Sequence, residues 1–301
     1  MNQHGDLRIP VILDTDIGTH VDDTWALAML LRCPEMDVRL VVSDTGDTEY
    51  RARVIARLLE VAGRPDVPVG IGMRQAEETG PPAPWVAGYE LSSYPGIVHQ
   101  DGVQAMIETL EASAQPVTLI CIGPMPNIAE VLRKAPHVAE SARFVGMHGS
   151  LRAHQDGGAG AVAEYNVRRD IRACRAVFNA PWLDRILAPL DTCGQVRLQG
   201  PRYAAVAKSR DPLARAVMES ERFFRNKSSD LESGILFDTV AVHLAYSTDF
   251  LEMEEMGIEV TDEGFTVRND DKKKIYVALR WTDLEGFKDD LVQRMLGKIQ
   301  G

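Results

Sequence analysis

The sequence has no excess of positive charge and no long apolar run. Its 33 Lys and Arg residues stand against 44 Asp and Glu residues, which gives a formal net charge of −11. A protein of this sign repels phosphate backbones and anionic lipids, because like charges repel. No segment approaches the ~20 apolar residues that a membrane-spanning helix requires. We therefore expect neither nucleic acids nor membranes as partners.

Cysteine is also scarce. The four cysteines, Cys33, Cys121, Cys174 and Cys193, lie far apart, and none forms a CxxC pair. They lie in or beside apolar runs, which predicts buried, reduced thiols rather than a disulfide framework. The first ten residues, MNQHGDLRIP, lack the charged start and apolar stretch of a secretory signal. These features predict a soluble, cytoplasmic protein.

Short apolar runs of β type alternate with longer segments of helical period in the first half of the chain. They cover residues 10–13, 23–31, 38–42, 48–61, 67–71, 103–110, 117–122, 127–132 and 144–147. This alternation predicts an α/β fold with a mainly parallel sheet flanked by helices. Further helices are expected at 171–178, 203–208, 213–224, 239–244 and from Leu284, and strands at 258–260 and 275–279. No linker or repeat divides the chain, so we expect one domain over residues 1–301.

The segment from Gln75 to Gln100 interrupts this alternation. It is rich in proline, glycine and aromatic residues, including Trp85, Tyr89 and Tyr94. Irregular loops of this length are uncommon in compact domains and often act as lids. The aromatic residues are either plain packing or a hydrophobic cover for a bound ligand.

Four carboxylates follow the first predicted strand in the segment LDTDIGTHVDDTWAL: Asp14, Asp16, Asp22 and Asp23. Ligands of open α/β sheets bind at the carboxyl ends of the strands, so these acids stand at the expected edge. A helix cap and a first-turn acid would account for only part of the group. Four converging carboxylates repel one another unless a cation lies among them, and oxygen-only ligands indicate Ca²⁺ or Mg²⁺. The segment therefore predicts a metal site.

This segment resembles the DxDPGxDD motif of the inosine-uridine preferring nucleoside hydrolases, with two additional residues in the loop. Four further segments resemble that family in the same order: 41–72, CIGPMPNIAEVLRKAP at 121–136, AEYN at 163–166 and LFDTVAVHLA at 236–245. The resemblance implies a Rossmann-like α/β core and hydrolysis of a ribonucleoside to ribose and free base. It also implies a bound calcium ion, a homodimer or homotetramer, and a role in purine or pyrimidine salvage.

The resemblance assigns the metal ligands. Asp16 aligns with the acid that both ligates calcium and accepts a proton from the attacking water. Asp23 and Asp238 match two further carboxylate ligands, and Asp238 also borders the substrate. The backbone carbonyl of Pro126 matches the remaining protein ligand.

The resemblance also assigns the substrate contacts. Asp22, Glu164 and Asn166 match residues that hold the ribose hydroxyls, and Met147 stands where the family has a methionine near the sugar. Cleavage of an N-glycosidic bond builds positive charge on the ribose ring, which surrounding carboxylates stabilise.

Four positions depart from the family pattern. Phe237 replaces a histidine proposed to protonate the departing base, and it is expected to form an apolar wall for that base. Asp47 replaces an asparagine and is expected to add a carboxylate near the substrate. Gly158 replaces an asparagine that contacts the 5′ hydroxyl. His20 lies in the enlarged loop between Asp16 and Asp22, which we call the acid loop.

The departures leave several alternatives open. The leaving-group acid is His20, His99, His148 or no residue at all. The protein is a hydrolase of a common ribonucleoside, a hydrolase of another N-riboside, or a non-catalytic calcium-dependent ribose-binding protein. A phosphatase with an aspartate nucleophile leaves the downstream motifs unexplained. Arg168 and Arg169 either bind a phosphorylated ribose or form surface ion pairs.

Overall fold

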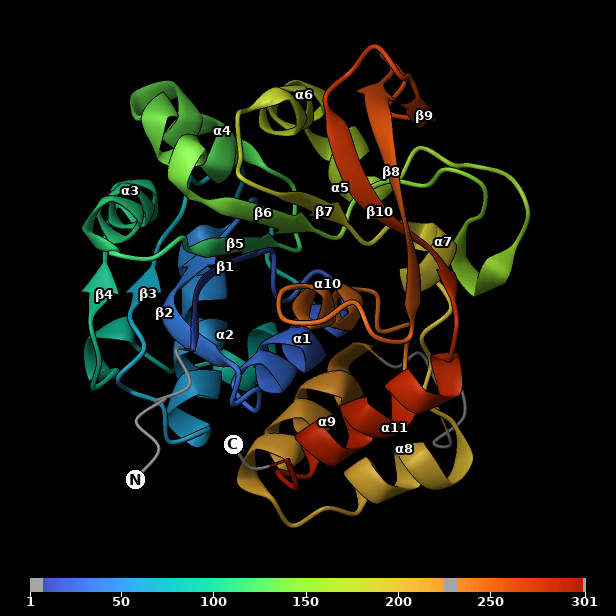
Figure 1. Ribbon diagram of the computed structural model, residues 1–301. Coiled ribbons are helices and arrows are strands. Elements are labelled where there is room, and N and C mark those ends of the chain that lie inside the picture. Colours follow the sequence, from blue (N-terminus) through green and yellow to red (C-terminus); the bar gives the residue numbers. More distant parts are fainter. Residues whose placement is uncertain (1–7, 225–231, 300–301) are drawn as a thin grey trace, which may run out of the picture.

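A computed structural model describes residues 8–224 and 232–299. The strands in this part of the chain form one sheet with the order β4-β3-β2-β1-β5-β6-β7-β10-β8-β9 (Figure 1). Their bounds are β1 Ile9–Thr15, β2 Met36–Ser43, β3 Val69–Gly70, β4 Val98–His99, β5 Thr118–Cys121, β6 Arg143–Gly146, β7 Arg185–Leu187, β8 Leu251–Val260, β9 Thr266–Arg268 and β10 Lys274–Trp281. All neighbours from β4 to β10 pair in parallel, and only β8 and β9 add antiparallel pairs. The predicted α/β class with a mainly parallel sheet is confirmed.

Helices cover both faces of the sheet. Their bounds are α1 Asp22–Leu30, α2 Thr48–Val61, α3 Gly102–Ala112, α4 Pro126–Lys134, α5 Tyr165–Arg169, α6 Ile171–Asn179, α7 Leu190–Cys193, α8 Gly200–Ala207, α9 Pro212–Phe224, α10 Asp238–Leu244 and α11 Leu284–Met295. Helices α3, α4 and α6 lie on one face, and α1, α2, α9, α10 and α11 lie on the other (Figure 1). Within the described ranges, no helix combines the length and hydropathy needed to cross a membrane.

Strand β1 lies at the centre of the sheet and is buried on both faces. Val11 and Leu13 belong to the core cluster that contains α1, whereas Ile12 belongs to the cluster beneath α3 and α4. Strand side chains alternate between faces, so a continuous apolar run is what a doubly covered strand requires. This burial fixes the place where β1 ends and the acid loop begins.

The short strands β4, β7 and β9 were not predicted from the sequence, and the strand predicted at 258–260 covers only the last part of β8. Strand β7 has only three residues and is defined by its pairing with β6 and β10. The first half of β8 reads LEMEE, and Glu252 and Glu255 are exposed where it pairs with β10 near the sheet edge. An edge strand of this kind lacks the apolar run that marks a buried strand.

The segment 75–100 packs against the body of the protein. Trp85 and Tyr94 are buried in the core cluster that contains α2. A Cβ atom on Gly80 would lie 1.6 Å from the Gly18 carbonyl oxygen, so this segment touches the acid loop directly. None of its residues lines the pocket described below, so of the two alternatives for its aromatic residues the structure supports packing.

Candidate active site

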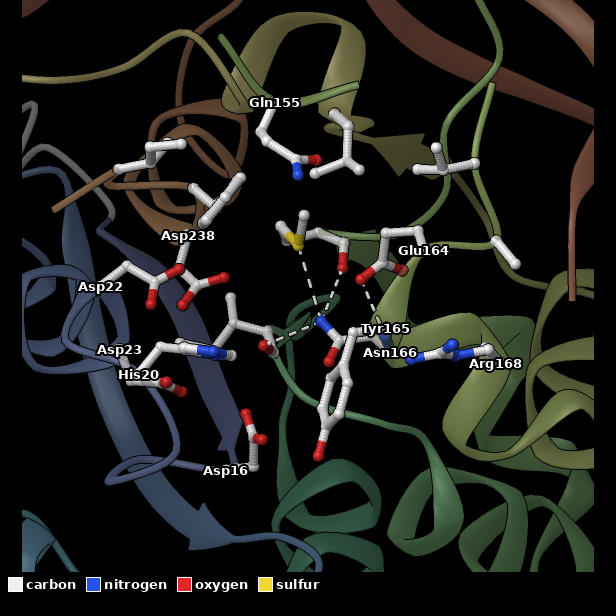
Figure 2. A pocket seen from close by; sticks show the side chains of 17 residues that line it. Asp16, His20, Asp22, Asp23, Gln155, Glu164, Tyr165, Asn166, Arg168 and Asp238 are labelled. Carbon is white, nitrogen blue, oxygen red and sulfur yellow. Dashed lines mark hydrogen bonds between the residues drawn. The ribbon is translucent and has the colours of Figure 1, made fainter. Parts of the chain in front are cut away.

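A pocket of about 480 Å³ opens at the carboxyl edge of the sheet (Figure 2). Its lining combines carboxylates, two amides and apolar side chains from α1, α5, α7, α10 and neighbouring loops, including those that follow β1, β5 and β6. The lining residues are Asp16, His20, Asp22, Asp23, Ile122, Met147, Gln155, Val162, Ala163, Glu164, Tyr165, Asn166, Arg168, Leu190, Ile235, Phe237 and Asp238.

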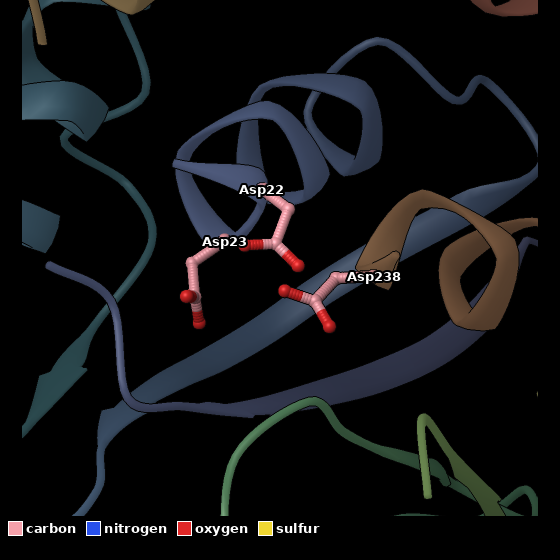
Figure 3. A group of neighbouring side chains, drawn as sticks. All are labelled: Asp22, Asp23 and Asp238. Atoms are coloured by element: carbon pink, nitrogen blue, oxygen red, sulfur yellow. The ribbon is translucent and has the colours of Figure 1, made fainter. Parts of the chain in front are cut away.

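Three buried carboxylates form a cluster at one side of the pocket. Asp22 and Asp23 are the first two residues of α1, and Asp238 is the first residue of α10 (Figure 3). One carboxylate oxygen from each lies within 4.8 Å of the others. The N-cap positions belong to Val21 and Phe237, which make no side-chain cap bond. The acids therefore do not serve as helix caps, and the positive ends of two helix dipoles favour their negative charge.

Burial governs the electrostatics of this cluster. It raises the pKa of Asp22 to about 6, and burial with neighbouring carboxylates raises the pKa values of Asp23 and Asp238 well above their usual range. The Thr15 hydroxyl donates to Asp23 at 2.6 Å. A cation among these oxygens would offset the desolvation and repulsion, and a donor set of carboxylates alone fits a hard divalent ion.

Asp16 directly follows β1, at the start of the turn that leads to α1, and lines the same pocket. Figure 2 shows its carboxylate apart from those of Asp22 and Asp238, and its charge contributes to the raised pKa of Asp23. No hydrogen bond to the Asp16 carboxylate occurs within residues 8–224 and 232–299. A Cβ atom on Gly123 would lie 3.1 Å from an Asp16 carboxylate oxygen, so the glycine leaves room for this side chain. Asp16 is thus a buried acid that faces the pocket, and its carboxylate has no hydrogen-bond partner among the described residues.

Two residues expected at the site are not among the described residues that line the pocket. Pro126 begins α4 and is not among the described residues that line the pocket. Asp47 caps α2, where its carboxylate accepts from the Tyr50 backbone N–H at 3.0 Å and pairs with Arg74 at 3.4 Å. Asp47 is therefore a helix cap rather than a pocket residue in this structure.

A different acid, Asp44, lies behind the pocket and was missed. It directly follows β2 and is fully buried, and its pKa is raised well above the usual range by burial and by Asp14. Burial also raises the pKa of Asp14 to about 7, although the Asn127 amide donates to it at 2.8 Å. The signal for Asp44 was present in the sequence, because an acid directly after a parallel strand lies at the ligand-binding edge.

The opposite side of the pocket is built by the AEYN segment. Glu164 caps α5 and accepts from the backbone N–H groups of Asn166 at 2.7 Å and Gly149 at 3.1 Å. Burial nevertheless raises the pKa of Glu164 to about 7. The Asn166 amide donates to the backbone carbonyls of Met147 at 3.1 Å and Ile122 at 3.2 Å. These bonds hold both polar side chains at the pocket wall.

The three histidines proposed as the leaving-group acid lie in different parts of the structure. His20 lines the pocket, and its ring meets the ring of Tyr165 edge-on at 6.2 Å. His148 is fully buried outside the pocket, bonded to the Gly123 carbonyl at 2.9 Å, and burial lowers its pKa to about 3. His99 lies on β4 at the far edge of the sheet. Of the three, His20 alone reaches the pocket.

Phe237 and Arg168, which the sequence singled out, line the pocket, whereas Gly158 does not. Phe237 lines the pocket together with Ile235, as an apolar wall requires. Tyr165 and Arg168 also line it, and both lie inside or just after the AEYN segment. Gly158 does not line it, and a Cβ atom there would lie 2.1 Å from the His154 ring.

Comparison with known proteins gives a consistent result. The family described as inosine-uridine preferring nucleoside hydrolase matches residues 11–289. The pyrimidine-specific ribonucleoside hydrolases RihA of Salmonella agona and Salmonella enteritidis are each 27% identical, over 96% of this chain and 99% of theirs.

Solved structures share the fold. The plant nucleoside hydrolase PpNRh1 has a TM-score of 0.82 at 20% identity and covers 96% of this chain and 99% of its own. The inosine-uridine preferring nucleoside hydrolase of Bacillus anthracis has a TM-score of 0.78 at 20% identity, over 97% and 100% of the two chains. The chain therefore belongs to the inosine-uridine preferring nucleoside hydrolase family and is a hydrolase of N-glycosidic bonds.

Proposed function

We propose that this enzyme uses bound calcium to hydrolyse the N-glycosidic bond of a ribonucleoside, releasing ribose and free base. One observation carries the proposal: a single pocket unites the buried cluster of Asp22, Asp23 and Asp238 with the anchored side chains of Glu164 and Asn166. A metal at the cluster and polar groups facing it suit a sugar with two adjacent hydroxyls.

Calcium would be held by Asp16, Asp23, Asp238 and the Pro126 carbonyl. Support comes from Asp23 and Asp238, which lie with Asp22 in a cluster of carboxylate oxygens, and from Asp16, which lines the same pocket. Burial disfavours the charged form of these carboxylates unless a cation is present. A bound calcium ion supplies charge that polarises water and sugar hydroxyls.

The residues of the chain orient the sugar and move the proton. Asp22, Glu164 and Asn166 would accept or donate hydrogen bonds at the ribose hydroxyls, with Met147 against the ring. Asp16 would take a proton from the attacking water, whose hydroxyl adds to C1′ as the bond from C1′ to the base nitrogen breaks. The surrounding carboxylates would stabilise the positive charge that develops on the sugar.

Leaving-group activation differs from the family pattern. Phe237 offers the base an apolar surface but no proton, whereas His20 is the one histidine in the described lining of the pocket. Proton transfer to the base would therefore come from His20, or the base would leave without help from a side chain. The second route favours another N-riboside with a good leaving group, which is the alternative substrate class.

A panel assay tests the function. Reducing-sugar release from inosine, uridine, adenosine and cytidine would be measured with the wild type and Asp16→Asn, with calcium and with chelator. We expect release of sugar and base by the calcium-loaded wild type alone. Binding of ribose without release from any riboside would support a binding protein and overturn the proposal.

A further inference from the structure

Arg168 lines the pocket on the side away from the acid cluster. Figure 2 shows it opposite Asp22 and Asp238, beyond Asn166. The lining carries five carboxylates, and Arg168 is the one lysine or arginine among its described residues. The pocket is therefore polarised, with a cation-binding side and a separate cationic side.

The Arg168 guanidinium has no polar partner among the described residues. In the part of the chain that the structure describes, its guanidinium makes no hydrogen bond and no ion pair. The acid one helical turn before it, Glu164, instead accepts from the backbone N–H groups of Asn166, Val167 and Gly149. The acid that follows α5, Asp170, accepts from the Ala173 N–H at 2.9 Å. The guanidinium is thus available to a bound molecule.

The stem of Arg168 is held although its head is exposed. Gly264 lies in the turn between β8 and β9 with a φ of +84°, and a Cβ atom there would lie 3.0 Å from the Arg168 Cα and 3.1 Å from its Cβ. The turn therefore packs directly on this residue. A stem held in place reduces the side-chain entropy that binding would otherwise cost.

On the basis of the proposed function, we infer that Arg168 recognises an anionic group on the riboside, and that this group is a phosphate on the 5′ carbon. The apolar wall of Phe237 adjoins Asp238 and suits the base, so the cationic side is left for the other end of the sugar. A guanidinium presents two parallel N–H donors that match phosphate oxygens.

The reaction then yields a phosphorylated sugar. The hydroxyl of water adds to C1′, the bond from C1′ to the base nitrogen breaks, and the remaining proton of that water ends on the base. The phosphate ester is untouched, so a nucleoside 5′-monophosphate gives ribose 5-phosphate and free base.

The test compares matched substrates and matched variants. We would measure kcat/KM for uridine, uridine 5′-monophosphate and orotidine, which carries its anionic group on the base. The variants are Arg168→Gln and Arg169→Gln, the second being the adjacent exposed arginine, which does not line the pocket. Calorimetry would compare binding of ribose 5-phosphate and ribose to the same calcium-loaded proteins.

We expect the wild type to prefer uridine 5′-monophosphate to uridine. Arg168→Gln should lower this preference by roughly 10- to 100-fold, the effect of losing charge-assisted hydrogen bonds, while Arg169→Gln leaves it unchanged. Ribose 5-phosphate should bind more tightly than ribose, and Arg168→Gln should remove the difference.

The possible failures are distinguishable. Cleavage of uridine without any preference for the monophosphate, with ribose and ribose 5-phosphate bound equally, overturns the inference and leaves the proposed function standing. A preference for orotidine that depends on Arg168 overturns the assignment to phosphate. If no riboside is cleaved, the proposed function fails, and equal binding of the two sugars then overturns the inference as well.

Discussion

The Arg51 guanidinium, on α2, donates to the backbone carbonyl of Ile17 in the acid loop at 2.9 Å. The same side chain donates to the carbonyls of Asp16 and, at 2.9 Å, Thr45. Arg51 is only 6% exposed. It therefore fixes the backbone of the loop that carries the proposed base, Asp16.

Arg51→Gln should lower kcat by roughly 10²-fold, because a shift of about 1 Å in Asp16 spoils its alignment with the attacking water. Arg51→Lys should recover part of this loss, since it keeps the charge but not the fork of donors. Steady-state kinetics with a nucleoside substrate would measure both variants. Glu49→Gln, an exposed change on the same helix, is the control and should leave kcat unaltered. A normal kcat in Arg51→Gln would contradict this positioning role.

Calcium should stabilise the wild-type fold through the acid cluster. Binding to the native state alone adds about 2.7 kcal/mol to the free energy of unfolding at a calcium concentration 100 times the Kd. Asp238→Asn should lose this effect, whereas the exposed change Glu263→Gln should retain it. Thermal melts of metal-stripped protein with and without calcium, together with calorimetric titration, would decide. Undiminished calcium affinity in Asp238→Asn would show that this residue is not a ligand.

Asp16→Asn should separate binding from turnover. The amide can still ligate weakly but cannot accept the proton of water, so kcat should fall by roughly 10²- to 10⁴-fold. The affinity for ribose, measured by calorimetry, should change little. Equal losses of affinity and turnover would assign Asp16 to binding alone.

The leaving group should control the rate. Since Phe237 cannot protonate a base, 4-nitrophenyl riboside, whose leaving group needs no proton, should react much faster than inosine. If His20 is the acid, His20→Ala should slow inosine cleavage by roughly 10²-fold and spare the nitrophenyl substrate. His99→Ala, on the far edge of the sheet, is the matched control. Equal rates for the two substrates in both the wild type and His20→Ala, with chemistry rate-limiting, would refute this account.

His148 should make the protein less stable in acid. Its pKa of about 3 in the folded state lies below the unfolded value of about 6.5, so the unfolded chain takes up the proton first as pH falls. Between pH 7.5 and 5.0 this linkage should lower the free energy of unfolding by about 2 kcal/mol.

Urea unfolding at the two pH values would measure this linkage in the wild type and in His148→Gln. The variant has no imidazole to protonate, so its loss of stability should be smaller by about 2 kcal/mol. An unchanged pH dependence in the variant would show that His148 takes up a proton in the folded state as readily as in the unfolded chain.

The local part of this architecture could be predicted from the sequence. Apolar runs that are followed by acids mark the ends of parallel strands, so the sequence alone indicates the α/β class and the acid loop of Asp14, Asp16, Asp22 and Asp23. Strands such as β7 and β9 could not be predicted, because three residues acquire strand geometry only by pairing with neighbours.

The candidate site likewise depends partly on local sequence and partly on tertiary packing. The sequence determined which acids exist and which strand carries them, because burial of β1 and the start of α1 depend on residues close in the chain. Only the tertiary structure decided that Asp44 and not Asp47 lies behind the pocket. It also decided that Arg168 faces into the pocket, with no ion-pair partner in the part of the chain that the structure describes. It also joined Asp238 to the acid cluster through the packing of α10 on α1. Contacts between residues so distant in the chain depend on how helices pack across the sheet, and that packing is set by the whole core rather than by any one segment.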